Sequence, residues 1–163
     1  ENVRLLGPPG VGKTHLAIAL GRAAIENGYR VLVVSAAVLV AQLAKAHING
    51  TLEARIAHFA KPQLLIIDEL GYLPFEVDAA HLLFQLVSRR YEAGAILLTS
   101  NRSVAEWGDV FGDAVVATAI LDRLLHHSHI ITIRGESYRL KEKRRSGLLS
   151  KPASATKSKP TKA

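Results

Sequence analysis

The sequence Gly7-Pro8-Pro9-Gly10-Val11-Gly12-Lys13-Thr14 follows a short apolar run, Val3 to Leu6, near the start of the chain. It matches the pattern G-x-x-x-x-G-K-[ST], whose glycines let backbone amides approach phosphate oxygens that a Cβ would obstruct. Residues 14–25 carry apolar side chains at helical spacing, so we predict a strand, a phosphate-binding loop and a helix whose N-terminal dipole favours anions. We expect Lys13 to reach the β- and γ-phosphates of ATP and the Thr14 hydroxyl to bind Mg²⁺. The alternative is a glycine-rich turn without a function.

A pair of acids ends a second apolar run, Leu64-Leu65-Ile66-Ile67-Asp68-Glu69. This is the Walker B pattern of a buried strand. Ligands of α/β sheets bind at the carboxyl ends of the strands, so the pair should lie beside the phosphate loop. Asp68 would then hold the magnesium shell and Glu69 would polarise the water that attacks ATP. The alternative is two solvated acids in a turn.

Apolar periodicity predicts an alternation of strands and helices along one domain. The predicted strands are residues 3–6, 30–34, 63–67, 95–99 and 130–133. The predicted helices are residues 14–25, 77–91 and 115–125, with two more in residues 37–60. Such an alternation is typical of an α/β fold with a mostly parallel sheet.

Further polar residues follow the predicted strands and helices. Thr99-Ser100-Asn101 ends the fourth strand, where Asn101 can hydrogen-bond the γ-phosphate or the attacking water, or can be an ordinary turn residue. We also assign His15, directly after the phosphate loop, to the nucleotide contacts. Arg123 in the last predicted helix is either a surface charge or an arginine finger for a neighbouring subunit.

The stretch from His126 to His129 suggests a metal site, but no acid or cysteine lies nearby in the sequence to complete one. We therefore expect these histidines at a helix end and a strand start. Trp107 and Tyr138 should pack in the protein rather than stack on bases, because no basic residues are interleaved around Trp107.

The positive charge is concentrated at the end of the chain. The net charge is +7, yet residues 1–140 carry 13 Lys and Arg against 13 Asp and Glu. Residues 142–163 are basic and, beyond Leu149, hold little that can be buried, so we predict a disordered tail after a core of residues 1–141. DNA binding by a neutral core should depend on oligomerisation or on this tail.

Composition excludes some classes of protein. The chain has no cysteine, so it can form neither a disulfide framework nor a thiolate metal site, as expected of a cytoplasmic protein. It has no apolar run near the ~20 residues that span a bilayer. The first residue is Glu1 rather than Met and no signal-peptide pattern follows, so we expect a chain truncated at its N-terminus.

Several segments together form a more specific pattern. They are residues 7–14, Asp68-Glu69-Leu70-Gly71-Tyr72-Leu73-Pro74, residues 84–92, 99–101, 106–108, 119–127 and 135–140. From about Val3 to Lys141 the chain thereby resembles the IstB-like ATP-binding proteins, the helper ATPases of insertion-sequence transposition. The DnaC-type helicase loaders are related and share the AAA+ core.

The resemblance implies an AAA+ P-loop NTPase, built as a three-layer sandwich around a mostly parallel five-stranded sheet with a minimal C-terminal lid. Its subunits would form a homo-oligomer on duplex DNA, largely without sequence preference, with ATP and Mg²⁺ at subunit interfaces and a transposase as partner. Asn101 would be the sensor-1 residue and Arg123 an arginine finger in trans. DNA contacts would come partly from the helices of residues 37–60. The candidate cations are Lys45, Arg55 and Lys61.

The chain also departs from the family pattern. We expect the chain to lack the helical domain that ordinarily precedes the phosphate loop in this family. Without a large lid, the second sensor arginine would be either Arg139 or Arg134. The expected function is an ATP-hydrolysing transposition helper, which the segment 68–74 favours. The alternatives are a DnaC-like helicase-loading ATPase and an inactive fragment of such a protein.

Overall fold

Five parallel strands form the sheet of the computed structural model, which describes residues 1–72 and 77–146. The strands are β1 (Asn2–Leu6), β2 (Val31–Ser35), β3 (Leu64–Leu70), β4 (Ala95–Ser100) and β5 (Ser128–Thr132). Their order is β2-β3-β4-β1-β5, and each neighbouring pair is parallel. The predicted five-stranded parallel sheet is confirmed. The order places β4 between β1, which leads into the phosphate loop, and β3, which carries the acid pair.

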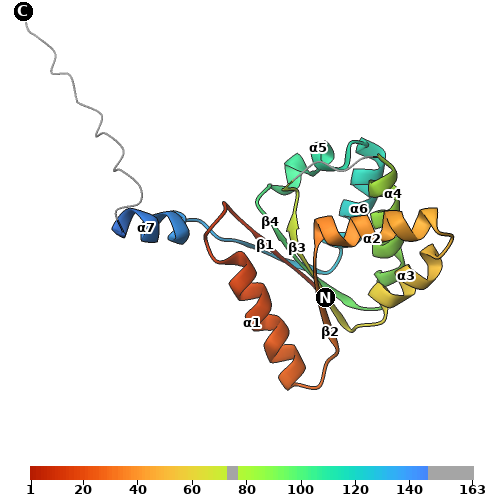
Figure 1. Cartoon of the computed structure of the whole chain (residues 1–163), viewed down its shortest axis with the longest axis horizontal. Coiled ribbons are helices and arrows are strands. Elements are labelled where there is room, and N and C mark those ends of the chain that lie inside the picture. Colours follow the sequence, from red (N-terminus) through yellow and green to blue (C-terminus); the bar gives the residue numbers. More distant parts are fainter. Residues whose placement is uncertain (73–76, 147–163) are drawn as a thin grey trace, which may run out of the picture.

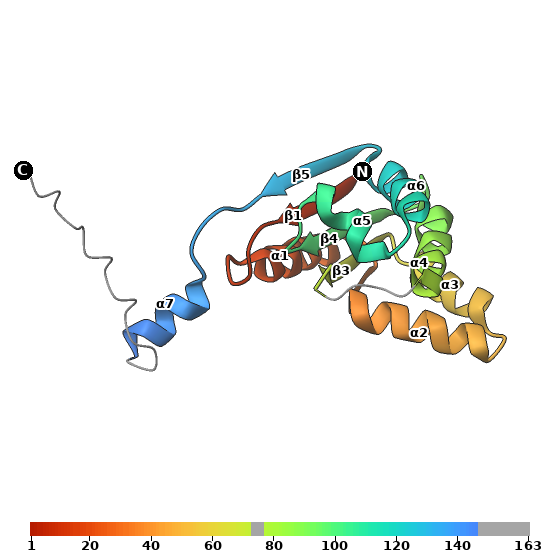
Figure 2. The same ribbon diagram turned by 90° about the horizontal axis from the view of Figure 1, so that it is seen from above.

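Helices cover both faces of this sheet, which makes three layers (Figures 1 and 2). Helix α1 (Lys13–Glu26) lies on one face. The opposite face is covered by α2 (Ala36–Ile48), α4 (Val77–Arg90) and α6 (Ala114–Leu125), with α3 (Leu52–Ala60) packed against α2 and α4. Helix α1 approaches closely through small residues, since a Cβ on Gly21 would lie 2.7 Å from Cδ1 of Ile66.

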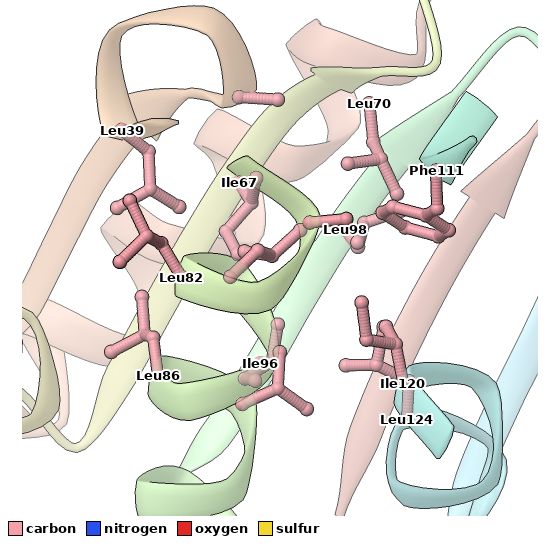
Figure 3. Close-up of a cluster of buried hydrophobic side chains, with 14 of the residues drawn as sticks. Leu39, Ile67, Leu70, Leu82, Leu86, Ile96, Leu98, Phe111, Ile120 and Leu124 are labelled. Carbon is pink, nitrogen blue, oxygen red and sulfur yellow. The ribbon is translucent and has the colours of Figure 1, made fainter. Parts of the chain in front are cut away.

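The larger part of the hydrophobic core lies between the sheet and α2, α4 and α6 (Figure 3). Leu82 and Leu86 of α4 belong to this cluster together with Leu39 of α2 and with Ile67 and Leu98 of the central strands. The α1 face buries a smaller cluster, Leu5, Ala17, Ile66 and Leu97. Apolar side chains on both faces explain why the central strands read as continuous apolar runs.

Two parts of the element prediction need correction. Strand β3 continues through Asp68 and Glu69 to Leu70, and β5 begins at Ser128 rather than at residue 130. The sequence analysis also missed the short helices η1 (Val104–Glu106) and α5 (Trp107–Phe111) and the terminal helix α7 (Tyr138–Arg145). Helix α7 escaped detection because charged residues give it no apolar period.

Helix α7 crosses the predicted boundary between residues 141 and 142 and lies apart from the helices that cover the sheet (Figures 1 and 2). Residues 147–163 of the predicted tail are outside the described residues, as are Leu73 and Pro74 of the family-like segment. Within the described part of the chain, no helix is long and apolar enough to cross a membrane.

Two arginines are buried, and they differ in how their charge is accommodated. Arg90, at the end of α4, is 1% exposed and donates to five backbone carbonyls, those of Phe59, Ala60, Pro62, Gln63 and Ala95, at 2.8 to 3.4 Å. Arg4 of β1 is also 1% exposed and donates through Nη1 to Ser128 Oγ at 2.5 Å. Its Nε and Nη2 have no hydrogen-bond partner among the described residues. Burial lowers the pKa of each guanidinium to about 10, so both are charged at neutral pH.

The poor pairing of Arg4 predicts that its charge destabilises the fold. We expect Arg4→Met to raise the free energy of unfolding by about 1 kcal/mol at pH 7, because an apolar side chain of similar length removes the cost of burying a charge without a counter-ion. Urea unfolding of the two proteins measures this. A lower unfolding midpoint for the variant would show that the guanidinium stabilises the protein.

Candidate functional site

The phosphate loop connects β1 to α1, and its glycines meet specific geometric demands. Gly10 has φ 82°, and a Cβ there would lie 2.1 Å from Ser137 Oγ. Gly12, which precedes the first residue of α1, has φ 95°, and a Cβ there would meet nothing within 4 Å. Only glycine adopts such angles freely. The missing Cβ of Gly10 also leaves room for Ser137, and the left-handed angle of Gly12 lets the chain enter α1.

A pocket of about 730 Å³ lies at this loop, at the carboxyl ends of β1, β3 and β4. Its lining includes predicted site residues, namely Pro9, Gly10, Val11, Gly12, Lys13, Thr14, His15, Glu69 and Asn101. It also includes Tyr72, Thr99, Tyr138 and Arg139. Segments far apart in the sequence therefore meet at one edge of the sheet, where α/β proteins bind their ligands.

Lys13 lies against the loop that precedes it. Its Nζ donates to the carbonyl oxygens of Gly7 at 2.7 Å and Pro8 at 2.8 Å. Gly7 and Pro8 thus contact the lysine and do not line the pocket themselves. Burial lowers the pKa of the Lys13 ammonium from its ordinary value, and the charges of Asp68 and Glu69 oppose that shift. The nearby carboxylates thus favour the cationic form, which is the form that binds phosphate.

Asp68 and Thr14, the two residues predicted to hold magnesium, lie next to each other in the structure. The Thr14 hydroxyl lies 3.1 Å from both Oδ1 and Oδ2 of Asp68. A carboxylate and a hydroxyl are hard oxygen donors, and Mg²⁺ commonly takes one or two protein oxygens while water and phosphate complete its shell. The donor set therefore fits Mg²⁺.

Glu69 lies at a bulge in β3. Ile67 pairs with Leu98 and Leu70 pairs with Ser100, so β3 has one residue more than β4 between these pairs. Glu69 has φ 63°, a left-handed angle that is uncommon for a residue with a Cβ. Its side chain is exposed and lines the pocket. Bulges re-aim side chains, and this one presents a carboxylate to the phosphate loop.

Asn101 follows β4 and is half-buried at the pocket. Its Oδ1 is buried and has no hydrogen-bond partner among the described residues. A buried amide oxygen without a hydrogen-bond partner is unusual in a folded protein. The position at the phosphate loop gives this amide access to a ligand in the pocket.

The start of α7 brings Tyr138 and one of the two candidates for the second sensor, Arg139, to the pocket. The backbone N–H of Tyr138 donates to Gly10 O at 3.0 Å, and both Tyr138 and Arg139 line the pocket. Tyr138 is 64% exposed, so the expectation that it packs in the protein is wrong, whereas Trp107 is fully buried as expected. Of the two candidates for a second sensor, Arg139 lies at the pocket and Arg134 does not line it.

Arg123 lies away from the pocket of its own chain. Its guanidinium stacks 4.7 Å from the ring centroid of Phe84, and Nη1 donates to Ala119 O at 3.2 Å. Of the cations suggested for DNA contacts, Lys45 and Lys61 are exposed, and Arg55 donates to Gln42 Oε1 at 3.4 Å.

The histidines differ from expectation in one respect, because an acid does lie near them. His129 Nε2 is 2.9 Å from Glu1 Oε2, because β1 and β5 are neighbours in the sheet. His126 Nδ1 is 3.0 Å from the hydroxyl of Tyr91. Among the described residues, no three His, Cys, Asp or Glu side chains form a group that could hold a metal ion.

Comparisons with known proteins agree with this geometry. The family model described as "IstB-like ATP binding protein" matches residues 1–146. The chain is 57% identical over 151 residues to the ATP-binding protein of insertion sequence IS21 from Pseudomonas aeruginosa, which covers 93% of the chain and 57% of that protein. It is 56% identical over 144 residues to the ATP-binding protein of insertion sequence IS5376 from Geobacillus stearothermophilus, covering 88% of the chain and 57% of that protein.

The fold is also similar to a crystal structure of the DnaC helicase loader. The TM-score is 0.68 with 22% sequence identity, and the similarity covers 82% of this chain and 78% of that one. At this identity the likeness concerns the fold alone. The chain spans 57% of the length of each of the two insertion-sequence relatives. The family model matches every residue that the structure describes, and Glu69 lines one pocket with the phosphate loop while Asp68 contacts Thr14 of that loop. The chain therefore belongs to the IstB-like ATP-binding proteins.

Proposed function

We propose that this chain is a Mg²⁺-dependent ATPase that assists DNA transposition. The observation that carries the proposal is one pocket lined by the phosphate loop, Glu69 and Asn101, with the Asp68 carboxylate held beside it at 3.1 Å from the Thr14 hydroxyl. Together they supply a phosphate cradle, a magnesium site and a group that orients water, as ATP hydrolysis requires. The insertion-sequence relatives support the setting in transposition.

Each residue has a distinct task in this proposal. The amides of the phosphate loop and the Lys13 ammonium bind the phosphates of ATP, and the α1 N-terminus adds its dipole. Thr14 and Asp68 would hold Mg²⁺, and the ion would neutralise negative charge on the phosphates of ATP. Glu69 accepts a hydrogen bond from the attacking water and orients it towards the γ-phosphate. Asn101 donates to the γ-phosphate or to the same water, and Arg139 reaches the pocket from α7.

The proposed partners are duplex DNA, bound largely without sequence preference, a transposase and further copies of this chain. A DnaC-like helicase loader is the alternative, but the likeness to DnaC supports only the fold. The distinguishing experiment is strand transfer by an IS21-type transposase into duplex DNA, with and without the chain and ATP. Stimulation by wild type but not by Lys13→Ala supports the helper function. Stimulation of helicase loading on single-stranded DNA without an effect on strand transfer would support the loader.

The position of Arg123 favours action on a neighbouring subunit, because the side chain does not reach its own pocket. We expect Arg123→Ala alone to lose ATPase activity and to regain part of it when mixed with Glu69→Gln. The latter subunit has an inactive site but an intact arginine for the site of its neighbour. ATP turnover across a series of mixing ratios measures this. The absence of rescue at every ratio would argue against action in trans.

The basic tail should carry much of the non-specific DNA affinity, since residues 1–140 have no net charge. Deletion of residues 142–163 is expected to weaken duplex binding and to reduce the slope of log K against log salt by about 0.9 for each phosphate that the tail neutralises. ATP turnover should persist. Fluorescence anisotropy of a labelled duplex over a range of salt concentrations is the measurement, and an unchanged slope would remove the tail from the DNA interface.

A further inference from the structure

Thr99, the penultimate residue of β4, contacts both members of the acid pair. Its hydroxyl donates to Asp68 Oδ1 at 2.5 Å and accepts from the backbone N–H of Glu69 at 2.9 Å. The residue is 1% exposed. A hydroxyl has a single proton to donate, and here that proton goes to Asp68 while an oxygen lone pair binds the amide of Glu69. One side chain thus determines the orientation of the magnesium-binding carboxylate and the backbone of the next residue.

The bulge explains why the amide of Glu69 needs such an acceptor. Asp68 and Glu69 together lie opposite Thr99, because β3 carries the extra residue between its pairs with Leu98 and Ser100. The extra residue of a bulge loses its regular ladder partner, and Glu69 in addition has the left-handed φ of 63°. The Thr99 hydroxyl replaces the missing acceptor. Without it, β3 can relax towards regular pairing, which would turn the Glu69 side chain away from its present direction.

We propose that Thr99 is a positioning residue for ATP hydrolysis. It keeps the bulge in place, so that the Glu69 carboxylate points into the pocket, and it fixes the Asp68 carboxylate beside Thr14. Thr99 acts through these two acids. The inference rests on the proposed ATPase function and adds to it a residue with a defined task.

Ser100 provides a matched control from the same strand. Its hydroxyl donates to Leu70 O at 2.7 Å and accepts from Arg102 N at 3.0 Å, and the residue is fully buried. It therefore links β4 to β3 as Thr99 does, but it contacts neither acid. If Thr99 acted only in strand pairing, removing the Thr99 hydroxyl and removing the Ser100 hydroxyl would have the same effect on ATP turnover.

The test compares Thr99→Val, which keeps the shape and removes the hydroxyl, with Thr99→Ser, which keeps the hydroxyl. We expect Thr99→Val to lower kcat for ATP by about tenfold to a hundredfold, with a KM close to that of wild type, because misplaced catalytic groups affect the transition state more than binding. Thr99→Ser should restore most of kcat, and Ser100→Ala should leave it unchanged. Thr99→Ala is a second variant without the hydroxyl, so the comparison does not depend on one substitution folding.

Amide hydrogen exchange of Glu69, followed by NMR, tests the positioning without reference to hydrolysis. The amide should exchange faster in Thr99→Val and Thr99→Ala than in wild type and Thr99→Ser. Unchanged exchange in the variants without the hydroxyl would overturn the inference, as would wild-type kcat in those variants or an equal loss of kcat in Ser100→Ala. A wild-type chain without ATP turnover would instead refute the proposed function, and the exchange measurement would still decide the role of Thr99.

Discussion

Glu69→Gln is expected to bind ATP as the wild-type chain does and to lose its turnover by a factor of about 10² to 10⁴, the range attributed to general acid–base groups. The glutamine keeps the size of the side chain at the bulge but cannot accept the proton of the water. Because Lys13, Thr14 and Asp68 are untouched, the phosphate and magnesium contacts should persist.

Equilibrium binding of a labelled ATP and steady-state turnover separate the two effects. Glu26→Gln is the matched control, because Glu26 lies exposed on α1 and pairs only with Arg22 among the described residues. Turnover by Glu69→Gln within about tenfold of wild type would mean that another group orients the water. Loss of ATP binding would mean that the charge of Glu69 has a role in the nucleotide site itself.

Arg90→Met should destabilise the fold by about 3–5 kcal/mol, since it removes the charged donors of hydrogen bonds to five backbone carbonyls. Those carbonyls belong to the end of α3, the segment before β3 and the first residue of β4. Arg90 therefore joins the starts of the two strands whose far ends hold the acid pair and Asn101.

The neighbouring arginine offers a direct comparison. Arg89 pairs with Glu53 on the surface, where both side chains are at least half-exposed, and Arg89→Met should cost less than about 1 kcal/mol. Urea unfolding at pH 7 of both variants gives the two values. Equal destabilisation would contradict the role assigned to the buried guanidinium.

The order of strands and helices could be predicted from the sequence because each central strand is an apolar run buried on both faces. The prediction ended β3 too early because it relied on apolar residues. Asp68 and Glu69 are polar, yet they belong to the strand as part of a bulge. Nothing in a periodicity reveals that Arg4 and Arg90 point into the core. Their burial depends on hydroxyl and carbonyl groups of segments that are distant in the sequence.

The site was predicted in its chemistry more completely than in its geometry. Local sequence patterns were sufficient to predict the phosphate loop with Lys13 and the acid pair. The loop has glycines and a lysine at fixed spacing, and the acids follow directly after an apolar strand. In the sequence, Thr99 is only one of three polar residues at the end of a strand. Its hydrogen bonds to Asp68 and Glu69 depend on the register between β3 and β4, which the sequence does not show. Tyr138 and Arg139 come to the pocket through a backbone hydrogen bond to Gly10, which no local pattern encodes.

The decisive experiment for ATP hydrolysis is turnover by the purified chain with Mg²⁺, in the absence and presence of duplex DNA. Lys13→Ala serves as the inactive reference. We expect wild type to hydrolyse ATP, its turnover to rise when duplex DNA is added, and Lys13→Ala to be inactive. A wild-type chain that binds ATP but remains as inactive as Lys13→Ala under both conditions would contradict this expectation and would favour an ATP-binding fragment without catalytic function.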